Sequence, residues 1–145
     1  MRPFSLGREL RMNEVSIFRL YLLRALYLLL FIGQATVTGP LILFPDPDLD
    51  LNRSVIRSFL GAISLLSLLG LRYPLKMLPL LMFEFAWKAI WVFAFWLRLW
   101  YGRDTAAVID ETFFEIALGV VLVPLVMPWG YVYRHYIKTP SERWK

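Results

Sequence analysis

Four charged residues interrupt long apolar stretches of this sequence: Arg24, Glu84, Lys88 and Glu115. A charge inside hydrocarbon costs several kcal/mol unless it is paired or faces a cavity, so each of these side chains needs a partner or a function. Two of the four are acids and two are bases. Such a set can carry protons or hold a charged headgroup or substrate, and it can equally fix helix packing through ion pairs.

The positions of these residues along their apolar stretches predict which of them meet. At about 1.5 Å per helical residue, Arg24 lies about 12 Å and Glu84 about 11 Å from the same side of the membrane. Lys88 lies about 17 Å and Glu115 roughly 18–20 Å from that side. We therefore expect Arg24 beside Glu84, and Lys88 beside Glu115. Glu84 and Lys88 are also four residues apart, which places them on one helix face.

The neutrality of this cluster favours the structural interpretation over the functional one. Two acids and two bases at matched depths cancel, as static interhelical pairing requires. A proton relay more often leaves a carboxylate unmatched. If the cluster does act in transport, we expect Glu115 to be its titrating member.

Aromatic residues accompany the charges on the same predicted helix. Trp87, Trp91 and Phe95 form a candidate ligand wall, with Trp91 and Phe95 continuing the face of Glu84 and Lys88. Such a wall suits an amphipathic ligand such as a quinone or lipid, with a cation stacked on indole. The commoner role of such aromatics is to fill lipid-facing and helix-packing volume.

Composition places these charges in a membrane protein. Of the 145 residues, 59% are hydrophobic and 19% are charged, and the mean hydropathy is +0.57. A soluble chain of this size buries only about 70% of the surface that its unfolded form exposes, and could not hide so much apolar area. These values exclude a disordered tail, a disulfide scaffold and a soluble nucleic-acid domain. Because there is no cysteine, thiol–disulfide exchange and iron–sulfur ligation are excluded too.

The apolar residues form four stretches, each close to the ~20 residues that a helix needs to cross about 30 Å of hydrocarbon. These stretches cover residues 17–37, 55–71, 77–99 and 107–129, followed by a tail at residues 130–145. We therefore predict an all-α fold: one integral membrane domain over residues 1–145, built as a four-helix transmembrane bundle with short loops.

Turn-forming residues and one proline shape the predicted bundle. Thr38-Gly39-Pro40 begins the first connection. Pro124 lies deep in the fourth stretch, where we expect it to kink the helix. The second stretch carries small residues at helical spacing, which lets a neighbouring backbone approach closely. These residues include Gly61, Ser64, Ser67 and Gly70. We favour a neighbour from the same chain over a second copy.

Lysine and arginine are distributed unevenly between the two sides of the bundle. Ten of them flank the side that holds both termini, against four on the other side. This bias predicts that both termini are cytoplasmic, with anionic headgroups as partners of the basic side. Because closed barrels dominate bacterial outer membranes, we expect the inner membrane.

No metal or cofactor site is predicted. Asp46, Asp48 and Asp50 have the spacing that opens a calcium loop, but Leu51 and Arg57 stand where a glycine and a bidentate acid belong. The single histidine has no second imidazole to bind a metal with it. The sequence contains no phosphate-binding glycine loop and no nucleophile elbow.

The leading hypothesis is a non-enzymatic accessory or assembly subunit, in which the charged cluster fixes helix packing and another membrane protein or a second copy is the partner. The alternative is a small transporter or binder of a lipid or quinone that uses Glu84, Lys88 and Glu115. The alternative needs a cavity that reaches Glu115, and a bundle sealed at that depth would refute it. An enzyme is a weaker option, because no nucleophile–base pair is visible.

Overall fold

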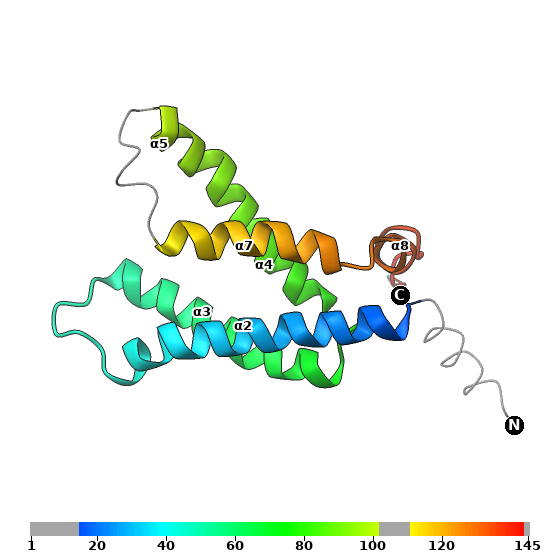
Figure 1. The fold of residues 1–145 in the computed structure, drawn as a ribbon, viewed down its shortest axis with the longest axis horizontal. Helices are drawn as coiled ribbons and strands as arrows, with labels where there is room; N and C mark the ends of the chain where they lie inside the picture. The colour runs from blue at the N-terminus through cyan, green and yellow to red at the C-terminus, as the bar shows by residue number, and fades with distance from the viewer. Residues whose placement is uncertain (1–14, 102–110, 144–145) are drawn as a thin grey trace, which may run out of the picture.

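The computed structural model describes residues 15–101 and 111–143, and every regular element within these ranges is helical (Figure 1). The predictions for residues 1–14, 102–110 and 144–145 lie outside the described part. The long helices are α2 (Ile17–Leu43), α3 (Leu51–Arg72), α4 (Leu78–Trp91) and α7 (Glu111–Val126). The short elements are the π-helical turn η1 (Val92–Trp96), α5 (Leu97–Tyr101), α8 (Trp129–Val132) and the π-helical turn η2 (Tyr133–Ile137).

Three helical segments are long and apolar enough to cross a membrane: α2, α3, and α4 together with η1. A fourth span results if α7 and the segment after it, bent by 73° relative to each other, count as one. The all-helical fold and the membrane-capable character of the first three predicted stretches are therefore confirmed.

The first helix is longer than predicted. The turn expected from residue 38 onward is wrong, because α2 continues through Pro40 to Leu43. Proline removes one backbone hydrogen bond, but the helix resumes at once, with the amide of Phe44 donating to the carbonyl of Pro40 at 2.9 Å. Ile42 also packs over Gly61 of α3, so the last turn of α2 is held by contact with its neighbour.

The 73° bend at the end of α7 lies beyond Pro124, the proline that was expected to kink the helix. α7 passes through Pro124 to Val126, and the chain turns at Met127 and Pro128. A residue before proline is pushed out of the helical region, which explains a break at Met127. The indole of Trp129 donates to the carbonyl of Pro124 at 2.8 Å, so the turned segment bonds back to the helix it leaves.

Helices α2 and α3 form an antiparallel pair with the largest interface in the described chain (Figure 1). Small residues of α3 make this interface. Ser64 donates to the carbonyl of Phe31 at 3.2 Å, Ser67 is fully buried, and the ring of Tyr27 packs against Gly70. The row of small residues on α3 therefore packs against α2 of the same chain, which confirms the interpretation that was favoured over a second copy.

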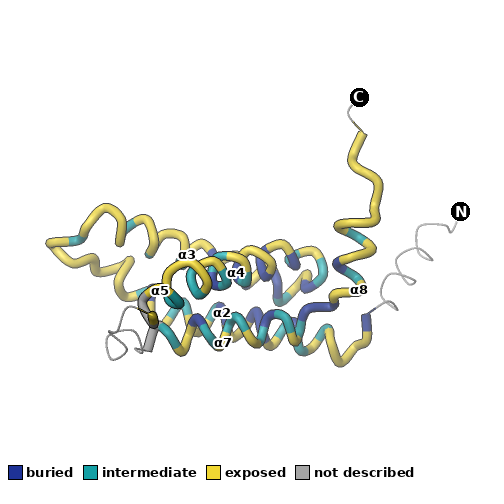
Figure 2. The backbone as a smooth tube through the Cα atoms, turned by 90° about the horizontal axis from the view of Figure 1, so that it is seen from above, coloured by how far each residue is buried: buried dark blue, intermediate teal, exposed yellow. Residues whose placement is uncertain are grey.

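The buried core lies toward one end of the bundle, where α8 and the beginning of α2 also lie (Figure 1). Its members are Leu23, Leu26, Tyr27, Leu30, Ile63, Leu78, Leu80, Leu81, Val123, Met127 and Val132. Away from this end α4 diverges from α2 and α3, and burial falls, as Figure 2 shows. The helices therefore separate where the core ends.

Candidate intramembrane binding cleft

A cleft of about 570 Å³ lies among α2, α3, α4 and α7. Its volume falls within the range of about 300–1,000 Å³ typical of small-molecule sites. Its walls are largely apolar, with Phe59 from α3 and Phe83 and Trp91 from α4. The divergence of α4 from α2 and α3 thus leaves an apolar space large enough for a ligand.

Three polar side chains line this cleft and also a neighbouring cavity of about 360 Å³ between α2 and α7. They are Gln34 from α2, Lys88 from α4 and Glu115 from α7. Gly33 of α2 lines the smaller cavity, and a methyl group there would meet nothing within 4 Å. The two cavities therefore adjoin at one set of polar groups.

Glu84 and Lys88 form a buried ion pair one helical turn apart on α4. The ammonium nitrogen of Lys88 lies 2.6 Å from Oε1 of Glu84, and their side chains are 6% and 0% exposed respectively. The indole of Trp87 donates to Oε2 of Glu84, also at 2.6 Å. Both carboxylate oxygens thus have a close partner, which a buried charge requires.

Gly119 of α7 provides the space that Lys88 occupies. A Cβ at this position would lie 2.5 Å from the Lys88 ammonium nitrogen and 2.8 Å from its Cδ. The backbone of α7 therefore approaches the lysine side chain closely, so that the ion pair of α4 is sealed by α7. This role of Gly119 was not predicted from the sequence, because Gly119 and Lys88 are far apart along the chain.

Glu115 does not pair with Lys88, contrary to the depth-based expectation. It lies one turn before Gly119, its side chain is exposed, and the part of the chain that the structure describes gives it no hydrogen bond or ion pair. Lys88 lines the same cleft but has its ammonium engaged by Glu84. Glu115 thus presents an unneutralised carboxylate to both cavities.

Arg24 does not meet Glu84 either. Its Nε donates to the carbonyl of Leu71 at 3.2 Å, and one turn further along α2 the hydroxyl of Tyr27 donates to the carbonyl of Pro74 at 3.0 Å. The last carbonyls of a helix lack partners within the helix, so they attract such donors. Arg24 therefore stabilises the end of α3, and Tyr27 stabilises the turn after it. Arg24 lies outside the charged cleft.

The aromatic wall differs in one member from the predicted set. Trp87 and Trp91 line the cleft, whereas Phe95 is 58% exposed and does not. Phe95 lies in η1, where the wider π-helical turn changes the register that an α-helix would keep. Its place in the wall is taken by Phe59 and Phe83. Phe59 lies on α3, and helical periodicity within α4 could not reveal it.

Other charged or titratable residues in the described part of the chain lie outside the cleft. Asp46 forms an exposed ion pair with Arg57 at 3.1 Å, and His135 stacks on Tyr131 with their ring centres 3.9 Å apart. Within residues 15–101 and 111–143, no three side chains of the metal-ligating types gather into a group.

Comparisons with protein-family models, with curated proteins and with solved structures gave no match. The cleft is therefore interpreted from its own geometry. It combines apolar walls contributed by four helices, a neutralised ion pair on one side and a carboxylate open to the cavity on the other. This arrangement can hold an apolar tail along the walls and a polar head at Glu115.

Proposed function

We propose that this protein is a small integral membrane protein that binds an amphipathic molecule among its four long helices. The observation that carries the proposal is the cleft of about 570 Å³ that reaches Glu115. A ligand-binding bundle needs such a cavity at that depth, whereas a purely structural charge cluster does not. We further propose that it lies in a bacterial inner membrane, because closed barrels dominate the outer membrane. The distribution of its lysines and arginines supports cytoplasmic termini.

The charge balance of the cleft favours a ligand whose head is positively charged or donates hydrogen bonds. Lys88 and Glu84 neutralise each other at 2.6 Å, which leaves the carboxylate of Glu115 as the uncompensated charge. Indole rings from Trp87 and Trp91 line the same space, and the faces of such rings attract cations. An alkyl amine or a quaternary ammonium headgroup fits both features.

The binding of decyltrimethylammonium to the protein in phosphatidylcholine nanodiscs tests this proposal. Quenching or shift of tryptophan fluorescence reports binding, because two of the tryptophans line the cleft. A charge-assisted contact contributes about 1.5–3 kcal/mol, so we expect Glu115→Gln to weaken binding roughly 10- to 100-fold.

Two controls make the result specific. Asp48→Asn removes a carboxylate from the loop between α2 and α3 and should leave binding unchanged. Decyl sulfate has the same tail and the opposite charge, and should bind weakly to the unaltered protein. Equal binding of both ligands, or an equal affinity for Glu115→Gln, would refute the proposal.

A second function is favoured by the buried pair itself. Glu84 has one ammonium and one indole as partners, and α7 covers Lys88 through Gly119. Such a pair can serve to fix α4 on α7 in an accessory or assembly subunit. In that case Lys88→Met should lower the cellular protein level together with any partner's assembly. A normal protein level combined with lost ligand binding would rule this role out.

A further inference from the structure

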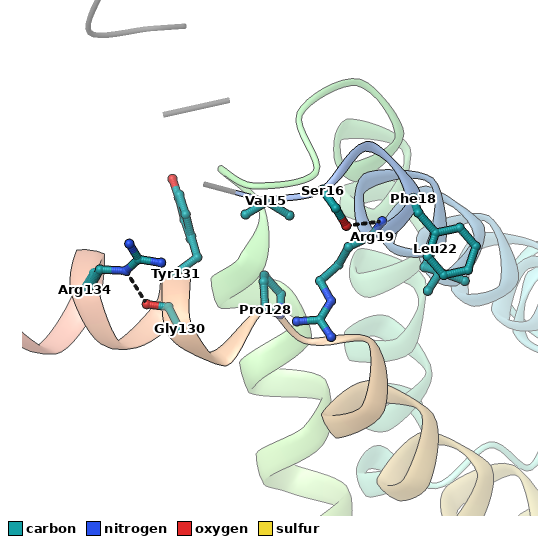
Figure 3. A pocket seen from close by; sticks show the side chains of 9 residues that line it. All are labelled: Val15, Ser16, Phe18, Arg19, Leu22, Pro128, Gly130, Tyr131 and Arg134. Carbon is teal, nitrogen blue, oxygen red and sulfur yellow. Dashed lines mark hydrogen bonds between the residues drawn. The ribbon is translucent and has the colours of Figure 1, made fainter. Parts of the chain in front are cut away.

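A separate pocket of about 270 Å³ lies where α2 begins and the chain turns into α8 (Figure 3). Ser16 and Arg19 line it from the start of α2, and Gly130, Tyr131 and Arg134 line it from the segment after the bend. It shares no residue with the cleft at Glu115. The 73° bend between α7 and the following segment brings these two parts of the chain together.

Two arginines give this pocket its chemistry. Arg19 reaches from α2 toward Pro128, and Arg134 lies on the other side, beyond Gly130 (Figure 3). The Nε of Arg134 donates to the carbonyl of Gly130 at 3.1 Å, which orients its guanidinium group. Among the described residues, those that line the pocket include no aspartate or glutamate. The described residues give the Arg19 guanidinium no ion pair, so this guanidinium can bind an anion in the pocket.

The surroundings of the pocket are those of a membrane surface. Ile17, next to the pocket, begins the 27-residue apolar helix α2. Phe18 lines the pocket and is 72% exposed, and Leu22 continues the apolar lining one turn into α2. Tyr131 lies on the far side, and tyrosine is typical of the boundary between hydrocarbon and water. An anion that binds here therefore has hydrocarbon beside it.

We propose that this pocket binds the phosphate of an anionic phospholipid. Guanidinium groups match phosphate oxygens in geometry and charge, and Phe18 and Leu22 offer contact to the first methylene groups of the acyl chains. A free phosphate ester shares the headgroup chemistry but cannot make the apolar contacts. The lipid is favoured because these apolar side chains lie beside Arg19 on α2 (Figure 3). This site is independent of the cleft at Glu115.

Lipid retention by the full chain, measured by native mass spectrometry, tests the site. The protein is extracted from mixed vesicles of phosphatidylglycerol and phosphatidylcholine, and the ratio of the two bound lipids is compared with the ratio supplied. We expect phosphatidylglycerol to be enriched. A basic residue near a membrane surface contributes about 1 kcal/mol, so Arg19→Gln should reduce this enrichment roughly fivefold.

Arg53→Gln is the matched control, because it removes an exposed arginine at the start of α3, far from this pocket in sequence and outside its lining. It should leave the enrichment unchanged. Arg19→Lys retains the charge and should keep most of it. Arg19→Gln and Arg19→Lys together decide the outcome.

Glycerol phosphate distinguishes the lipid from a free phosphate ester. At millimolar concentration in neutral detergent, it should neither displace bound phosphatidylglycerol nor raise the thermal stability of the protein. Displacement by glycerol phosphate would overturn the assignment to a lipid. Equal enrichment in Arg19→Gln and Arg53→Gln would overturn the site itself. Binding of decyltrimethylammonium should be unaffected in Arg19→Gln. A failure of the lipid-site proposal can therefore be distinguished from a failure of the proposed function.

Discussion

Removing the lysine of the buried pair should destabilise the protein strongly, and removing both charges should not. Lys88→Met leaves the carboxylate of Glu84, which is 0% exposed, with the indole of Trp87 as its remaining donor. The negative charge that remains is then buried without a cationic partner.

The size of the effect follows from the burial of the charge that is left behind. Breaking a buried pair by removing one partner costs about 3–5 kcal/mol. We therefore expect Lys88→Met to lower the free energy of unfolding by about 3–5 kcal/mol.

Unfolding in mixed micelles, followed by far-UV circular dichroism, measures this loss. Glu84→Gln combined with Lys88→Met removes both charges while the indole of Trp87 still has an oxygen to bond, so the double variant should regain most of the stability. Lys76→Met, which removes an exposed lysine from the turn after α3, should change it by less than about 0.5 kcal/mol. A single variant Lys88→Met as stable as the double variant at pH 7 would refute the reasoning.

Three further predictions concern packing and surface charge. Gly70→Ala should cost about 1–3 kcal/mol, because its Cβ would overlap the buried ring of Tyr27, whereas Gly33→Ala meets nothing within 4 Å and should be neutral or stabilising by up to about 1 kcal/mol. Unfolding in micelles measures both, and equal losses would contradict the α2–α3 packing. Tyr27→Phe should cost about 1 kcal/mol in the same assay, because it removes a buried hydrogen bond to a backbone carbonyl; an unchanged midpoint would show that this bond contributes nothing. Arg57→Gln should cost less than about 1 kcal/mol, because its partner Asp46 is 63% exposed, and the cost should fall further in 0.5 M salt. A salt-independent loss would point to packing and not to charge.

The length of the apolar stretches was sufficient to predict α2, α3 and α4, because a helix can cross the core of a bilayer only if nearly all of its residues are apolar. The ends of these helices were harder to predict. Pro40 and Pro124 both lie inside helices, whereas Pro128 marks the bend. All three remove a backbone donor, and the outcome depends on what the next turn contacts. The packing of Ile42 over Gly61 is such a contact, and these two residues are far apart in the sequence.

The candidate site was predicted in part, for a similar reason. The spacing of Glu84 and Lys88 was enough to predict a shared helix face, because it is local. Depth alone did not determine which partner each charge takes, since depth says nothing about rotation around the helix axis. Arg24 therefore bonds to the end of α3, and Glu115 remains open to the cleft.

The measurement that tests the central claim most directly is the protection of a single cysteine in the cleft. The natural chain has no cysteine, so Gln34→Cys provides one thiol beside Glu115, and Leu81→Cys provides a buried control in the core. A water-soluble methanethiosulfonate reagent is applied to nanodiscs with and without decyltrimethylammonium. We predict that the cysteine at 34 reacts, that the ligand slows this reaction at least tenfold, and that adding Glu115→Gln abolishes the protection. A cysteine at 34 as unreactive as that at 81, or one that the ligand does not protect, would contradict the account.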